Sequence, residues 1–111
     1  MNFLSLTYKL TPEKTGGFSV VCLDWDSVYT QGETVGECKK NAVEVTEMMI
    51  DLLNSGELDK SVHPKINRHK AHPMNFQLTF DIERAKHITI SQLPKKGKFL
   101  TIKKIPVNDD L

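Results

Sequence analysis

The segment from Thr34 to Gly56 carries a helical pattern that constrains the fold more than any other part of the chain. Thr34 and Glu37 have the spacing of a capping box, in which two side chains satisfy free N–H groups at a helix start. The apolar positions then recur at steps of three and four: Val35, Cys38, Ala42, Val45, Met49 and Leu52. Because Gly56 is a typical stop signal, the pattern predicts a helix of about twenty residues that needs an apolar surface of similar length to pack on.

Segments before this helix predict that surface as a β-sheet. Residues 4–10 alternate between apolar and polar side chains, as in a strand with one buried face. The glycines at 16 and 17 predict a hairpin turn. Residues 18–23 are apolar at nearly every position, which predicts a central strand covered on both faces. A short third strand is expected at 28–31.

Segments after the helix predict further strands. Residues 57–73 are polar and contain two His-Pro pairs, which favours an extended connection over a helix. Residues 74–82 alternate over nine positions, the clearest strand pattern in the chain. Two more strands are expected at 87–93 and 99–107.

The predicted fold class is therefore α+β, a β-β-β-α core followed by additional C-terminal β-strands. We divide the chain into the core at 1–58, a polar connector at 59–73 and a C-terminal β extension at 74–111. The extension is expected to pack as part of the same domain or at an oligomer interface. Val43, Met48 and Ile50 lie off the apolar stripe and predict a second apolar helix surface, which favours a homodimer or higher oligomer.

The net charge of +1 conceals an asymmetry between the two halves of the chain. Residues 1–58 contain four basic and nine acidic residues, a balance of −5, and residues 59–111 contain eleven basic and five acidic residues, a balance of +6. This split suits the first half to a basic partner, the second half to an anionic one, or both. An equally open interpretation is that the two halves neutralise each other within the fold or between subunits. No stretch approaches the roughly 18 apolar residues of a membrane span, and the first residues lack secretory features, so we expect a cytoplasmic protein without membrane contact.

Catalytic and metal-binding patterns are weak. Asp24 and Asp26 are the only close acidic pair near a strand end, and a solvated acidic loop is the expected role for them. Zinc sites usually combine histidine with cysteine or carboxylate at tight spacing, and neither cysteine is close in sequence to the four histidines. Cys22 and Cys38 are expected to be buried free thiols. We therefore predict no catalytic residues, no metal, no cofactor and no enzymatic activity.

A group of residues in the first half resembles the pattern of the HicB family of type II toxin–antitoxin antitoxins. The matching residues are Gly17-Phe18, Val20-Val21, Asp24, Thr30-Gln31-Gly32-Glu33-Thr34, Glu37-Cys38 and Asn41-Ala42. The resemblance covers about residues 1–58 and implies a partial ribonuclease-H-like fold. It also implies a non-catalytic antitoxin that binds and neutralises a small basic HicA-type toxin, which is an mRNA interferase. The family usually has prolines around the acidic loop, and this chain has none there.

Candidate binding residues follow from the acidic loop and from the basic tail. For a toxin-like partner they are Asp24, Trp25, Asp26 and Tyr29, since aromatic anchors among charges are typical of interface centres. An equally open role for Trp25 and Tyr29 is to cap the core. For nucleic acid the candidates are Lys95, Lys96, Lys98, Lys103 and Lys104. A solvated turn and the protection of an edge strand by lysine explain the lysine-rich turn equally well. The alternatives to an antitoxin are a DNA-binding autorepressor of its operon and a HicB-like homo-oligomer without a toxin.

Overall fold

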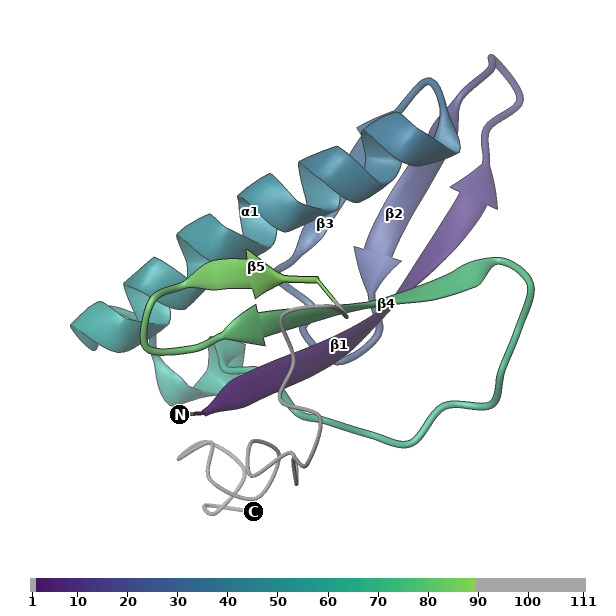
Figure 1. Cartoon of the computed structure of the whole chain (residues 1–111). Helices are drawn as coiled ribbons and strands as arrows, with labels where there is room; N and C mark the ends of the chain where they lie inside the picture. Colours follow the sequence, from purple (N-terminus) through teal and green to yellow (C-terminus); the bar gives the residue numbers. More distant parts are fainter. Residues whose placement is uncertain (1, 90–111) are drawn as a thin grey trace.

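The fold is an antiparallel sheet with one long helix on one face (Figure 1). The computed structural model describes residues 2–89. The strands are β1 (Phe3–Pro12), β2 (Phe18–Cys22), β3 (Tyr29–Gly32), β4 (Asn75–Asp81) and β5 (Lys86–Ile88), and the helices are α1 (Val35–Ser55) and the short 3-10 helix η1 (Lys60–Val62). The strand order is β3-β2-β1-β4-β5, and every neighbouring pair is antiparallel. The α+β class and the β-β-β-α order of the first half are as predicted.

Strand β1 is the centre of the sheet and carries the core. Its even-numbered residues Leu4, Leu6, Tyr8 and Leu10 are buried. Tyr8 identifies their side as the helix side, since its hydroxyl lies 2.6 Å from the Thr46 hydroxyl of α1. Across the β1–β4 ladder, Leu4 and Leu6 pair with Phe80 and Leu78. Each large apolar side chain buried in this way contributes roughly 1.5–3 kcal/mol before conformational entropy is subtracted.

The buried face of α1 is rotated from the predicted stripe. Its fully buried positions are Cys38, Ala42, Thr46 and Ile50. Val35, which we expected on the buried stripe, is 40% exposed. The polar Thr46 belongs to the centre of the buried face because its hydroxyl bonds with Tyr8, a contact that apolar periodicity does not reveal.

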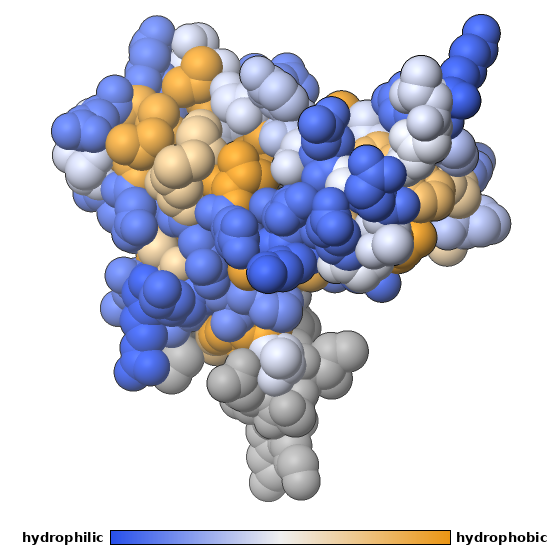
Figure 2. All heavy atoms as spheres, turned by 90° about the horizontal axis from the view of Figure 1, so that it is seen from above, coloured by the Kyte–Doolittle hydropathy of each residue, from blue (hydrophilic) through white to orange (hydrophobic). Residues whose placement is uncertain are grey.

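The second apolar helix surface that we predicted is absent from α1. Ile50 is fully buried in the core, and Val43 packs against the core. Of the three residues, only Met48 is largely exposed, at 57%. In the view of Figure 2, hydrophobic residues form small groups separated by hydrophilic ones. Helix α1 therefore gives no separate support for an oligomer.

Strand β2 is not covered on both faces, contrary to the prediction. Val20 and Cys22 are buried, but Val21 is 44% exposed on the opposite face. The reason is the architecture: α1 covers one face of the antiparallel sheet, and β2 lies beside the central strand β1 with its other face open. A continuous apolar run is therefore compatible with a strand that has one open face.

The hairpin and the start of α1 meet in a tight joint that requires glycine. Gly17 has a φ of 74° and a Cβ at this position would lie 2.8 Å from the Gly32 carbonyl oxygen. At Gly32, a Cβ would lie 2.9 Å from the Cys38 backbone nitrogen. The helix begins as predicted, with the Glu37 N–H donating to the Thr34 hydroxyl at 3.1 Å. The glycines thus let α1 approach the end of the sheet.

Replacing Gly32 with alanine is expected to lower the free energy of unfolding by about 1–3 kcal/mol, because the new methyl group has to displace helix backbone. The matched control is Gly36→Ala in the first turn of α1, where the nearest atom to a Cβ is 4.0 Å away. That change is expected to stabilise the protein by about 0.5–1 kcal/mol. Urea denaturation measures both, and destabilisation by both variants to the same extent would contradict the role of the joint.

Both described cysteines are buried free thiols, as predicted. Burial raises the pKa of the Cys22 thiol to about 12. Burial also raises the pKa of the neighbouring Tyr8 phenol above its usual range. Both groups therefore keep their protons in the folded protein at pH values where the unfolded chain loses them.

Stability should consequently fall as the pH rises above about 8.5, the usual thiol pKa in an unfolded chain. The pKa of Cys22 is higher in the folded protein than in the unfolded chain. Its contribution to the free energy of unfolding is therefore complete below pH 8.5 and is lost progressively up to about pH 12. Between these limits we expect a loss of about 1.4 kcal/mol per pH unit from Cys22. Urea denaturation of wild type and Cys22→Ala from pH 7 to 10 measures this. An identical pH slope in the two proteins would contradict it.

The connection from α1 to β4 is extended apart from η1, as predicted, and it packs on the domain. Pro64 is among the fully buried side chains, and Ile66 packs against the core. Among residues 2–89, no helix has both the length and the apolar character needed to cross a membrane. The predicted strand at 87–93 begins within β5. Its residues from 90 on lie outside the described residues, as does the whole of the predicted strand at 99–107.

Candidate functional site

The site is organised around the buried carboxylate of Asp24, in the loop between β2 and β3. Asp24 is 3% exposed. Its Oδ2 accepts the Thr7 backbone N–H at 2.8 Å, and its Oδ1 lies 2.9 Å from the Asn67 N–H and 2.7 Å from His69 Nε2. The Lys65 N–H donates to the Asp24 backbone carbonyl at 2.7 Å. One residue thus joins the central strand, the loop and the distant connector.

The local sequence explains why the carboxylate turns inward. Strand β2 ends at Cys22, and the Leu23 N–H makes the next backbone bond, to the Thr7 carbonyl at 2.8 Å. The Asp24 side chain then takes the Thr7 N–H, which would otherwise lack a strand partner at this point. A tight turn follows, in which the Val28 N–H donates to the Trp25 carbonyl at 2.9 Å. The carboxylate therefore terminates the β1–β2 ladder.

Trp25 belongs to the core. Its side chain is 1% exposed, and its indole Nε1 donates to the Val62 carbonyl at the end of η1. Val28, at the other end of the turn, is also 1% exposed. Of the two open roles for Trp25, capping the core is the one that its burial supports. Trp25 and Asp24 together hold the connector against the loop.

The four predicted partner-binding residues are therefore divided by the fold. Asp24 and Trp25 are buried within the chain, whereas Asp26 is exposed and Tyr29 is 68% exposed. The expected solvated acidic loop is wrong for Asp24, because three N–H groups compensate for the loss of water around its carboxylate. Asp26 and Tyr29 are the members of the set that can reach a partner.

No pattern in the sequence identifies Asn67 and His69 as partners of Asp24. They are 43 and 45 residues away along the chain, in a polar segment without periodicity. The grouping of three histidines within ten residues was a visible signal, but nothing in the sequence links His69 with Asp24. Only the path of the connector across the sheet brings them together.

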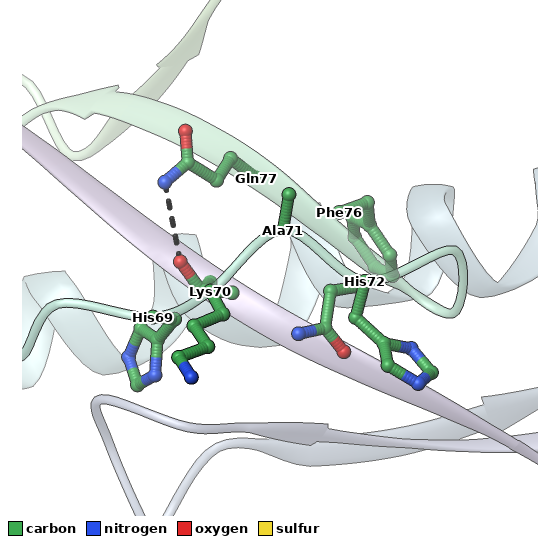
Figure 3. Close-up of a pocket in the computed structure, with 8 residues that line it drawn as sticks. His69, Lys70, Ala71, His72, Phe76 and Gln77 are labelled. Atoms are coloured by element: carbon green, nitrogen blue, oxygen red, sulfur yellow. Dashed lines mark hydrogen bonds between the residues drawn. The ribbon is translucent and has the colours of Figure 1, made fainter.

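Two hollows flank the Asp24–His69 contact. One has a volume of about 280 Å³, between the acidic loop and the segment after η1, and its lining includes Asp26, His63 and Lys65. The other has a volume of about 400 Å³, where residues 69–72 cross β1 and β4 (Figure 3). The second hollow is lined by basic and amide side chains and by no carboxylate.

A third hollow, of about 370 Å³, lies between the β1–β2 turn and the start of α1. Glu13, Glu33 and Glu37 line it, and all three are exposed. Asn41 also lines it, and its Nδ2 donates to the Gln31 carbonyl of β3 at 2.8 Å. This acidic groove lies at the end of β3 opposite to Asp26.

Within residues 2–89, no three histidine, cysteine, aspartate or glutamate side chains are grouped as a metal site would require. The five candidate lysines for nucleic acid, Lys95, Lys96, Lys98, Lys103 and Lys104, lie outside the described residues.

Comparisons with protein-family models, with curated proteins and with solved structures find no match to this chain.

Proposed function

We propose that the chain is a non-catalytic, antitoxin-like protein that binds and neutralises a small basic partner of the HicA toxin type. The observation that supports this proposal most is the set of exposed acidic groups at the two ends of the edge strand β3. Asp26 lies just before the strand beside the exposed Tyr29, and Glu33 and Glu37 follow it. Glu13 from the β1–β2 turn extends the acidic end. A surface of this charge steers a basic protein toward it and selects against acidic ones.

Tyr29 gives the surface an anchor. It is 68% exposed and pairs across the ladder with Val21, which is 44% exposed. The two side chains form an apolar spot on the open face of the sheet, and Asp26 lies three residues before Tyr29 in the chain. Aromatic side chains bordered by charge are typical of the centre of a binding interface. A partner that covers Tyr29 would place its basic residues near the acidic ends of β3.

The proposed class of partner and the proposed fold family both rest on the resemblance to HicB antitoxins. The β-β-β-α order of residues 3–55 supports grouping the domain with partial ribonuclease-H-like folds. The same resemblance supports a non-catalytic role in the cytoplasm. Operator binding and oligomer formation by this chain are further proposals, for which residues 90–111 are the part to test.

The test uses the product of a small basic open reading frame next to this gene, co-expressed with the full chain. We expect a stable complex, and the double variant Asp26→Lys/Tyr29→Ala should weaken it at least about tenfold, since an opposed like charge and a lost anchor each cost more than 1 kcal/mol. Calorimetric titration measures the Kd. Glu83→Lys is the matched control, because Glu83 is exposed in the β4–β5 turn. No complex with wild type, or equal weakening by Glu83→Lys, would reject the proposed surface.

A further inference from the structure

The hollow under residues 69–72 has no role in the proposed partner contact. It has a volume of about 400 Å³, within the range of small-molecule sites. Its polar lining comes from the connector, from β1 and from β4, and includes His69, Lys70, His72, Asn75 and Gln77. We propose that this hollow, the connector pocket, binds the phosphate group of a small molecule.

The connector pocket offers several hydrogen-bond donors from short stretches of chain. Lys70 contributes an ammonium group that can only donate. His72 accepts the Met74 N–H on its Nδ1 at 3.0 Å, so its neutral ring has the proton on Nε2 and donates there. Asn75 and Gln77 add side-chain amides from β4. In Figure 3 the His69, Lys70 and His72 side chains project from the same side of the crossing segment.

The charge of the lining selects an anion. Lys70 is positive, His72 presents its Nε2–H, and no carboxylate is among the residues that line the connector pocket. Lys9 adds a further positive charge nearby, because it pairs in register with Asn75 across the β1–β4 ladder. A phosphate group has several strongly accepting oxygens, so it can receive bonds from an ammonium, an imidazole and amides at once.

The donors are held in place before a ligand arrives. His69 Nε2 lies 2.7 Å from the buried Asp24 carboxylate, which fixes the start of the crossing segment. At its other end the Asn75 N–H donates to the His72 carbonyl at 2.9 Å. Gln77 Nε2 donates one proton to the Thr7 hydroxyl at 3.2 Å, the bond drawn in Figure 3, and has a second one left. His69 and Asp24 are therefore positioning residues for the connector pocket.

The test is a titration of the full chain with inorganic phosphate, with adenosine monophosphate and with adenosine. Calorimetry and backbone amide chemical shifts measure the binding. We expect both phosphate compounds to bind and to shift the amides of residues 69–77, and adenosine not to bind. Equal affinity for inorganic phosphate and adenosine monophosphate assigns the pocket to free phosphate. Tighter binding of adenosine monophosphate assigns it to a phosphorylated metabolite. Lys70→Gln should weaken phosphate binding about tenfold, as loss of a charged hydrogen bond predicts.

Lys65→Gln is the matched control, since Lys65 is an exposed lysine of the same connector that does not line the connector pocket. It should leave the affinity within about twofold, a change below 0.5 kcal/mol. Gln77→Leu, at an exposed strand position, is the second variant and should also weaken binding. The proposal is overturned if neither phosphate compound binds, if only a single-stranded oligonucleotide binds, or if Lys65→Gln weakens binding as much as Lys70→Gln. Retention of the basic protein partner by Lys70→Gln separates this pocket from the proposed partner surface.

Discussion

Replacement of Trp25 by alanine is expected to lower the free energy of unfolding by about 3–5 kcal/mol, the usual cost of removing a large aromatic side chain from a core. The side chain is 1% exposed, and its indole N–H bonds to the Val62 carbonyl at the end of η1. The variant therefore loses packing and leaves a carbonyl without its donor. Urea denaturation followed by far-ultraviolet circular dichroism measures the change, since indole fluorescence is lost with the only tryptophan.

Two controls separate a core role for Trp25 from a role in partner contact. Trp25→Phe keeps much of the packing but removes the N–H, so it should cost less than Trp25→Ala. Tyr29→Ala removes the neighbouring exposed aromatic side chain and should change stability by no more than about 0.5 kcal/mol. If Trp25→Ala were as stable as Tyr29→Ala, the buried position of Trp25 would be wrong.

Much of the fold follows from local patterns in the sequence. The alternation in β1 and β4 predicts both strands, because a strand with one covered face has a side-chain period of two. The ends of α1 are equally local, since Thr34 caps the start and Gly56 adopts a left-handed conformation at the end. These features depend on residues within four positions of one another. They are therefore readable without knowledge of the tertiary structure.

The site depends on contacts that local patterns do not encode. Trp25 and Tyr29 are similar aromatic residues four positions apart, yet one is buried and the other is exposed. The turn between them and the distant Val62 decide this difference. The same holds for Thr46, whose buried hydroxyl is explained by Tyr8, 38 residues earlier. Polar residues in a core are identified by their partners, and the partners are set by the topology.

The residues on which the proposed resemblance to HicB antitoxins rests have clear structural roles in this chain. Gly17 and Gly32 form the tight joint with α1, and Asn41 donates to the Gln31 carbonyl at 2.8 Å. These contacts fix the helix to the end of the sheet whether or not a partner is present. Specificity for a partner would therefore come from exposed positions such as Asp26 and Tyr29, which lie between the shared positions.

The second large effect is expected from Asp24→Ala, which should lower the free energy of unfolding by about 3–5 kcal/mol. The change removes the acceptor for the Thr7 and Asn67 backbone N–H groups and for His69. A buried donor left without a partner costs about 1–3 kcal/mol, and the Thr7 bond is fully buried. Urea denaturation measures the loss. Asp26→Ala, in the same loop but exposed, should stay within about 0.5 kcal/mol of wild type.

A double-mutant cycle with His69→Ala shows how much of this effect passes through the connector. His69 bonds to the same Asp24 carboxylate oxygen as Asn67. The effects of Asp24→Ala and His69→Ala on the free energy of unfolding should therefore be non-additive by about 0.5–3 kcal/mol. In Asp24→Ala, amide hydrogen exchange should become faster at Asn67 and also at Lys65, whose N–H donates to the backbone carbonyl of residue 24. Additive effects with unchanged exchange would mean that the connector is held by Trp25 and Pro64 alone. In that case Asp24 would stabilise only the end of the β1–β2 ladder.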